Sequence, residues 1–198
     1  MTPRSVLAAL VLASTFAAGA HGQTAAAGRL LVASPSVDDP NFSETVLLIL
    51  LHQDGGSAAV FLNRPTWVDP AEAFPEIDAL LSYDGALYLG GPVGPTEFLT
   101  LFEVDGPAPD SALPLGEGIF FSPNPALLGQ LDFTAPAGPR VRIYAGHAEW
   151  GPGQLAAEIA ADRWRVLRAG PEHVFAEDHS TLWESLIVSR DGVSASIF

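Results

Sequence analysis

The chain has 198 residues, 48% of them hydrophobic, and 23 acidic residues against 9 basic ones give it a formal net charge of −14. This length predicts one domain with at most a short appendage, and the hydrophobic content excludes a disordered tail. The negative charge disfavours nucleic acid and anionic membranes as partners, and the lack of cysteine excludes thiol catalysis, zinc–thiolate sites and iron–sulfur clusters.

The N-terminus has the pattern of a secretory signal peptide. A short basic segment, MTPR, precedes the apolar run SVLAALVLASTFAAGA, and small residues then offer cleavage near Ala20 or Gly22. The run is shorter than the roughly 20 residues of a membrane-spanning helix, and no cysteine follows that could carry a lipid. We therefore expect residues 1–22 to be removed and the protein to be exported, to the periplasm or the exterior, without a stable membrane anchor.

The first third of the chain reads as a flexible lead-in followed by strands. Residues 23–28 form the lead-in, and apolar, β-branched runs bounded by turn residues predict strands at 29–33, 44–52 and 57–63. The turn Asp54-Gly55-Gly56 predicts that the last two form a hairpin.

The middle of the chain mixes short helices with strands. Asp69 before Pro70 predicts the N-cap and first residue of one short helix, and a second would begin at Pro75 with its apolar side at Ile77, Leu80 and Leu81. Strands are expected at 86–89, 98–104 and 119–122, separated by a Pro/Gly-rich surface loop over 105–116.

The last third predicts a short helix at 125–131, a half-exposed strand at 140–145, a helix at 154–162 and a strand at 164–168. Thr181 and Glu184 predict a capping box before a final helix, which Gly192 would follow. Because not every strand is followed by a crossover helix, the pattern indicates an α+β fold with a mixed sheet. We expect one domain over 29–190 and a C-terminal tail over 191–198.

Residues 144–159, YAGHAEWGPGQLAAEI, contain the sequence Gly151-Pro152-Gly153, which resembles a phosphate-binding loop at the start of a helix. That geometry needs a strand that runs directly into the first glycine, whereas this strand is expected to end near Ala145. No clear acidic residue follows at the expected distance either. The stretch is better explained as a strand-to-helix joint with Trp150 covering the start of the helix, so no cofactor is predicted.

The same stretch also offers residues for a metal site or a nucleophilic site. His147 and Glu149 would face the same way on an extended segment. No ligand spacing elsewhere completes a metal site with them, so no metal is predicted. No nucleophile motif surrounds any serine, although a catalytic triad is defined by geometry that sequence alone does not give.

Several stretches in a fixed order resemble the YqgE/AlgH-like family, also called DUF179 or UPF0301. They are LLVASPSVDDPNFSETVLLILLH with GGSAAVFLNRP, then YLGGPV, IFFSPNPALLGQL and YAGHAEWGPGQLAAEIAADRW. The resemblance implies an α+β domain in which a bifurcated sheet curls into a pseudo-barrel flanked by short helices. It also implies a bacterial source and a description as a transcriptional regulator, but it assigns no catalytic residues. Two features depart from the family pattern: the export signal, and Glu149 in place of the usual glycine before Trp150.

We expect a non-catalytic domain that binds a small ligand or a protein partner through loops at strand ends, where binding residues gather. The candidate residues are Asp39, Asn41, Asn63, Arg64, Gly90, Gly91, His147, Glu149, Trp150 and Gln154. Arg64 could grip a carboxylate or phosphate, or instead pair with Asp38, Asp39 or Glu44. Two alternatives stay open: a hydrolase that uses His147 and Glu149 as acid and base, and the regulator role, against which export and acidity speak.

Overall fold

The computed structural model describes residues 24–104, 109–131 and 138–188. The predicted signal peptide and C-terminal tail lie outside these residues. The strands are β1 (Arg29–Ala33), β2 (Val46–Gln53), β3 (Gly56–Phe61), β4 (Leu87–Leu89), β5 (Val93–Glu103), β6 (Leu113–Gly116), β7 (Ile119–Ser122), β8 (Arg140–Trp150) and β9 (Trp164–Arg168). The α-helices are α1 (Pro70–Ala73), α2 (Gln154–Ala160), α3 (Pro171–Val174) and α4 (Leu182–Val188), and the 3-10 helices are η1 (Asp78–Ser82) and η2 (Pro125–Gln130).

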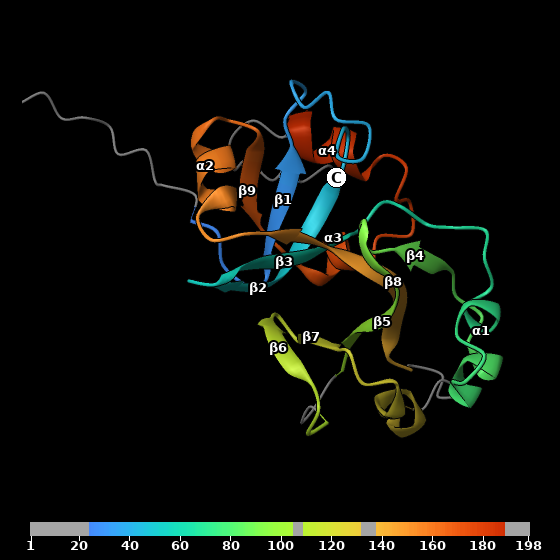
Figure 1. Ribbon diagram of the computed structural model, residues 1–198. Coiled ribbons are helices and arrows are strands. Elements are labelled where there is room, and N and C mark those ends of the chain that lie inside the picture. Colours follow the sequence, from blue (N-terminus) through green and yellow to red (C-terminus); the bar gives the residue numbers. More distant parts are fainter. Residues whose placement is uncertain (1–23, 105–108, 132–137, 189–198) are drawn as a thin grey trace, which may run out of the picture.

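All of these strands belong to one mixed sheet (Figure 1). Its order is β6-β7-β5-β8-β3-β2-β1-β9, and β4 pairs with β8 beside this path. The pairing is antiparallel except between β4 and β8, which run parallel. The long strand β8 pairs with β5 over most of its length and with β3 near its end, so it joins the two halves of the sheet. The predicted α+β class is confirmed.

The sheet is curled, so that its outer strands approach one another. Gly28, just before β1, packs closely against the carbonyl group of Leu115 in β6. Arg168 at the end of β9 forms an ion pair with Glu117 in the β6–β7 turn. The pseudo-barrel implied by the family resemblance is therefore present as a half-open barrel.

Both faces of the central strands are buried, which explains their continuous apolar sequences. Leu30 and Val32 of β1 point into the barrel, and Leu31 and Ala33 pack on the opposite face beneath α2. A smaller core lies beneath α1 and η1. Within the described ranges, no helix has the length and hydropathy needed to cross a bilayer.

Three expectations about the elements were wrong. Strand β6 lies inside the segment expected to be a loop; it is short and outermost, and an edge strand tolerates Pro114. The second central helix begins at Asp78 rather than Pro75, and Leu81 is exposed rather than apolar-facing. Strand β8 runs on to Trp150 instead of ending near Ala145.

The expected half-exposed character of β8 is also wrong at Arg142, which is only 6% exposed. Its guanidinium stacks on the ring of Tyr88 at 4.5 Å and donates hydrogen bonds to the carbonyl oxygens of Leu62 and Ala176. Because no carboxylate among the described residues pairs with this cation, the hydrogen bonds and the cation–π contact are what make its burial tolerable.

Candidate functional site

The stretch from β8 into α2 is a backbone joint. Gly153 is the N-cap of α2 and has a φ of 75°, in the left-handed region that glycine adopts without strain. The side-chain oxygen of Gln154 accepts a hydrogen bond from the Gly151 N–H at 3.2 Å. Strand β8 does run directly to Gly151, contrary to expectation. The Gly151 N–H, which a bound phosphate would need as a donor, is already hydrogen-bonded to the Gln154 side chain.

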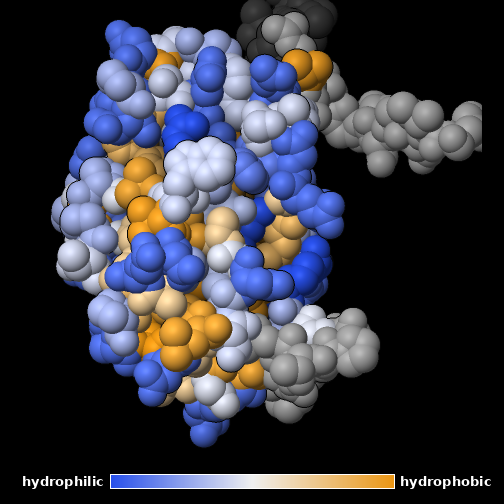
Figure 2. All heavy atoms as spheres, turned by 90° about the vertical axis from the view of Figure 1, so that its right-hand side faces the viewer, coloured by the Kyte–Doolittle hydropathy of each residue, from blue (hydrophilic) through white to orange (hydrophobic). Residues whose placement is uncertain are grey.

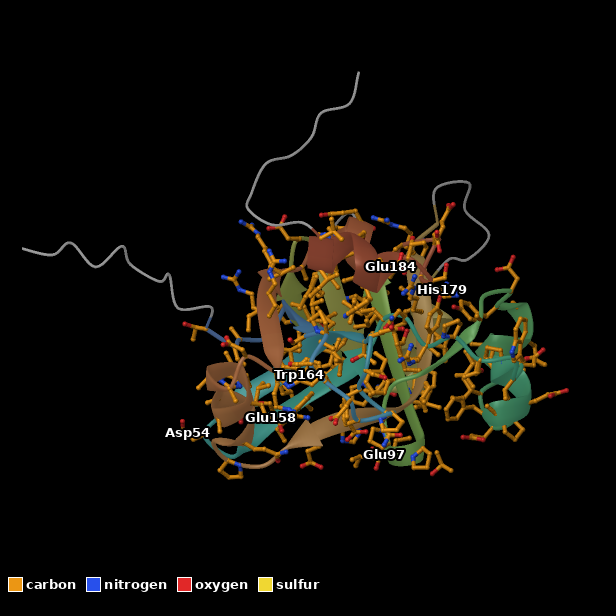
Figure 3. The ribbon with its side chains drawn as sticks, turned by 90° about the horizontal axis from the view of Figure 1, so that it is seen from above. Asp54, Glu97, Glu158, Trp164, His179 and Glu184 are labelled. Carbon is orange, nitrogen blue, oxygen red and sulfur yellow. The ribbon has the colours of Figure 1, made fainter. Side chains whose placement is uncertain are left out.

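Glu158 of α2 fastens this joint to the sheet. Its carboxylate accepts hydrogen bonds from the indole N–H groups of Trp150 at 3.0 Å and Trp164 at 2.7 Å, and from the Gln154 amide at 3.0 Å. Glu158 and Trp164 lie side by side in Figure 3. Partial burial alone would raise the pKa of Glu158, but these three hydrogen bonds and the charge of Arg163 lower it below its ordinary value. Trp150 is buried, as expected for a residue that covers the start of α2. Trp150 and Gln154 both hold α2 in place through their hydrogen bonds to Glu158.

Gly90 and Gly91 are also placed by packing. A Cβ at Gly90 would overlap the carbonyl oxygen of Gly146, and one at Gly91 would overlap the main chain of His147. The segment between β4 and β5 can therefore lie directly on β8 only because these two residues have no side chain.

Asp39 and Asn41 shape the loop between β1 and β2. The Asp39 carboxylate accepts a hydrogen bond from the Asn41 N–H at 2.9 Å, and the Asp39 carbonyl accepts from the N–H groups of Phe42 and Ser43. Asn41 is exposed. These contacts make a local turn, and neither residue lines the pockets that contain Arg64 or His147.

His147 and Glu149 lie two residues apart on β8 and line one pocket of about 300 Å³ beside the β2–β3 hairpin. The Nδ1 atom of His147 lies 3.4 Å from a carboxylate oxygen of Glu97 on β5. The expectation that the two side chains face the same way is confirmed. Among the residues that the structure describes, no group of three or more metal-ligating side chains occurs.

An apolar pocket of about 390 Å³ adjoins this one and is lined by residues of β2, β3, β5, β7 and β8. Its lining includes Leu50, Phe98, Leu99 and Phe121, with His147 and Glu97 also lining it. Most of the residues that line it are apolar.

Asn63, just after β3, holds the segment that leads into β2. Its side-chain oxygen accepts a hydrogen bond from the Val46 N–H at 3.0 Å, and its amide donates to the Glu44 carbonyl at 2.8 Å. Glu44 has a φ of 55°, a left-handed conformation that costs a non-glycine residue about 1–2 kcal/mol. The buried Asn63 amide helps to hold Glu44 in this conformation.

Arg64 and Asn63 line a third pocket, which is polar and has a volume of about 270 Å³; we call it the Arg64 pocket. Arg64 donates one hydrogen bond, from Nη2 to the Ser43 carbonyl at 2.8 Å. The ion pair considered for Arg64 with Asp38, Asp39 or Glu44 is not formed: within the described chain its guanidinium pairs with no carboxylate. The other residues lining the pocket are Glu44, His179, Ser180, Trp183 and Glu184.

The far wall of the Arg64 pocket comes from α4 and the turn before it. The Trp183 indole N–H donates to the Ala33 carbonyl at 2.8 Å and so fastens α4 to β1. Ahead of the helix, Asp178 accepts hydrogen bonds from the N–H and hydroxyl groups of Ser180 and Thr181, which lower the pKa of Asp178 to about 2. The Thr181 hydroxyl, which was expected to take part in a capping box with Glu184, donates a hydrogen bond to Asp178.

The sequence did not indicate that His179, Ser180, Trp183 and Glu184 would face Arg64. They follow it by more than a hundred residues, and no local pattern links the two segments. In Figure 3, His179 and Glu184 lie together and well apart from Glu97, which contacts His147. The expected candidates therefore do not share one pocket within the described residues: Asn63 and Arg64 line one, and His147 and Glu149 line another.

The surface that carries α1 and η1 shows hydrophobic residues in separate groups with hydrophilic residues between them (Figure 2). In the segment leading to α1, Trp67 is fully exposed and Val68 is about half exposed, and Leu81 of η1 is also exposed.

A family model described as AlgH-like (DUF179) matches residues 30–194. The chain belongs to the AlgH-like family. A UPF0301 protein of Streptomyces coelicolor is 36% identical over 176 residues, covering 86% of this chain and 89% of the relative. A UPF0301 protein of Chlorobaculum tepidum is 32% identical over 166 residues, covering 83% of this chain and 87% of the relative.

Two solved structures share the fold of this AlgH-like chain. A crystal structure of a Corynebacterium diphtheriae protein superposes with a TM-score of 0.71 at 27% identity, covering 85% of this chain and 88% of that one. The solution structure of the AlgH protein from Pseudomonas aeruginosa gives a TM-score of 0.59 at 26% identity, covering 84% of this chain and 95% of that one. The family resemblance of the sequence is thereby confirmed.

Proposed function

We propose that this AlgH-like protein is an exported, non-catalytic domain that binds a small ligand in the Arg64 pocket. The observation that carries the proposal is the Arg64 guanidinium, which lines a polar pocket with only one of its N–H groups bonded to a described residue. A guanidinium in such a position is suited to hold a carboxylate or phosphate group by paired hydrogen bonds.

The pocket wall at Glu44 is held in a strained conformation. Asn63 bonds both to the Glu44 carbonyl and to the Val46 N–H, and the Thr45 hydroxyl donates to the Phe42 carbonyl at 2.7 Å. Left-handed, non-glycine residues persist only where the surroundings hold them, and they gather at functional sites. A pocket wall fixed in advance favours binding because less order has to be imposed when the ligand enters.

The Ser180 hydroxyl in this pocket has only a weak base as its partner among the described residues. It donates its hydrogen to Asp178 at 2.6 Å, and the pKa of that carboxyl group, lowered to about 2, makes it a poor general base for a nucleophilic serine. This contact supports binding rather than covalent catalysis at the Arg64 pocket.

Export is supported by the sequence pattern of residues 1–22. Expression in a bacterial host with fractionation would test it. A periplasmic or secreted product whose N-terminus starts after Ala20 or Gly22 is expected, and an intact N-terminus on protein retained in the cytoplasm would refute export.

The binding proposal is tested by calorimetry of the purified protein with small carboxylates, inorganic phosphate and amino acids. The Arg64→Gln variant should lose binding by about tenfold or more, because a charge-assisted contact is removed. Arg29→Gln is the matched control, since Arg29 is an exposed arginine outside the pocket. Equal binding by both variants, or no binding of any compound, would exclude the Arg64 pocket as the site.

A second candidate function is acid–base hydrolysis at His147 and Glu149. It is favoured by the finding that both side chains line one pocket. Once an activity is found in a panel of ester and amide substrates, replacing both residues with alanine should abolish it. An unchanged rate in the double variant would discard this candidate.

The family's regulator description is the third candidate, and the net charge of −14 weighs against contact with DNA. A gel-shift experiment at low salt tests it directly. No shift is expected, and a salt-sensitive shift would favour regulation over the binding role proposed above.

A further inference from the structure

We infer that the Arg64 pocket takes a diamino monocarboxylic acid, with L-lysine as the representative. The inference rests on the proposed function and adds the class of ligand. Its basis is the set of charges lining the pocket: one guanidinium, from Arg64, and two carboxylates, from Glu44 and Glu184. Lysine carries the opposite set, one carboxylate and two ammonium groups.

The three charges are free to meet a ligand. Among the described residues, Arg64, Glu44 and Glu184 form no ion pair with one another or with other side chains. These three side chains together therefore give the lining a net charge of −1. A ligand with a net charge of +1 balances it, and the protein's overall negative charge attracts such a ligand.

The remaining residues of the pocket and its volume suit the hydrocarbon chain and the size of such a ligand. The Trp183 ring lines the pocket while its N–H is held by the Ala33 carbonyl, so the ring is fixed and can pack against methylene groups. His179 also lines the pocket, and its buried Nδ1 atom has no hydrogen-bond partner among the described residues. At about 270 Å³ the pocket lies below the usual range for drug-sized ligands, which favours a molecule of amino-acid size.

Simpler ligands leave part of this lining unpaired. A monocarboxylate or inorganic phosphate would pair with Arg64 but would bring further negative charge beside Glu44 and Glu184. A diamine would pair with the two glutamates and leave Arg64 without an anion. Sites that present fixed polar partners reject ligands that lack the matching groups, because those partners are then left unsatisfied.

The first test is calorimetric titration of the purified full chain, at low ionic strength, with four compounds of similar size. L-Lysine has all three groups, L-norleucine lacks the side-chain ammonium, 6-aminohexanoate lacks the α-ammonium, and 1,5-diaminopentane lacks the carboxylate. L-Lysine should bind most tightly, and each of the other three should bind at least about tenfold more weakly.

The second test assigns the two ammonium groups to the two glutamates. In Glu44→Gln and in Glu184→Gln, the affinity for L-lysine should fall about tenfold, and one of the two single-ammonium analogues should then bind as well as L-lysine. Arg64→Gln should remove the advantage of L-lysine over 1,5-diaminopentane. Glu76→Gln, which changes the same charge at an exposed residue outside the pocket, should bind L-lysine as the unmodified protein does.

The outcomes separate the inference from the proposed function. If L-norleucine or 6-aminohexanoate binds as tightly as L-lysine and Arg64→Gln weakens both, the pocket binds carboxylates and the diamino class is wrong. If none of the four compounds binds but another carboxylate or phosphate does in an Arg64-dependent way, the inference is likewise overturned while the proposed function holds. If no compound depends on Arg64, both are overturned.

Discussion

The indole N–H of Trp164 in β9 donates a hydrogen bond to the Glu158 carboxylate in α2 at 2.7 Å. The same carboxylate oxygen accepts from Trp150 at the end of β8 at 3.0 Å. One side chain on a seven-residue helix thus ties together two strands that are not neighbours in the sheet. The stability of α2 and its packing on β8 and β9 should depend more on Glu158 than on the intrinsic helix propensity of α2, because an isolated helix of this length is only marginally stable.

Replacing Glu158 with glutamine should lower the free energy of unfolding by about 1 kcal/mol, because one charge-assisted acceptor is lost while an amide oxygen remains. Urea unfolding followed by tryptophan fluorescence measures this. Glu76→Gln is the control at an exposed site and should change little. Equal stability of the two variants would contradict the role given to Glu158.

The same contact predicts a pH dependence. The folded-state pKa of Glu158 is lowered below its ordinary value of 4.5, so its contribution is present above that pH and is lost as the pH falls through the folded value. The stability difference between the unmodified protein and Glu158→Gln should therefore shrink when the pH is lowered from 7 to 3. A difference that grows on acidification would have the wrong sign.

Gly90→Ala should destabilise the fold by about 1–3 kcal/mol, because the new methyl group would overlap the Gly146 carbonyl and the main chain must shift. The matched control is Gly129→Ala, where a Cβ would meet no atom within 4 Å. Thermal unfolding of both variants gives the comparison. A Gly90 variant as stable as its control would show that β4 and β8 can separate at no cost.

Asn63→Asp keeps the shape of the side chain but removes the donor to the Glu44 carbonyl. The loss of a buried hydrogen bond and the approach of two oxygens should cost about 2 kcal/mol of unfolding free energy and weaken ligand binding in the Arg64 pocket. Asn41→Asp makes the same chemical change at an exposed residue and should be nearly neutral. Unfolding and calorimetry on both variants test the two effects separately.

Asp178 should titrate far below an ordinary aspartate. Hydrogen bonds from Ser180 and Thr181 lower its pKa from 3.8 to about 2, so its contribution to the turn before α4 is present above pH 3.8 and lost only towards pH 2. The ¹³C signal of its carboxyl group should stay almost constant between pH 5 and 3. Thr181→Val removes one donor and should move the titration towards 3.8, and a midpoint already near 3.8 in the unmodified protein would refute the contact.

Strands and caps that depend on local sequence could be predicted. The bounds of β1 and β9 and the Asp69 N-cap of α1 agree with expectation, because apolar runs between turn residues and an Asp–Pro pair act over a few residues. Strand β6 was missed since Pro114 and its short length are typical of loops, and only its pairing with β7 makes it a strand.

The candidate site was predictable only in part, for a similar reason. Asn63 and Arg64 stand out because they end a hairpin strand, and strand ends commonly carry binding residues. The partners across the pocket, His179 and Glu184, reach it through the packing of α4 on β1, which depends on Trp183 and on the curl of the whole sheet. The burial of Arg142 could not be predicted either, because the carbonyl groups that accept its hydrogen bonds come from distant parts of the chain.

The contact between the two edges of the sheet affects whether two molecules can associate through their edge strands. Strand β6 faces main chain at Gly28, and Arg168 and Glu117 tie the end of β9 to the neighbouring turn. Both outer strands are also short, with four and five residues. A second copy therefore finds little open backbone along which to add a strand, so edge-to-edge aggregation is not expected even at high protein concentration.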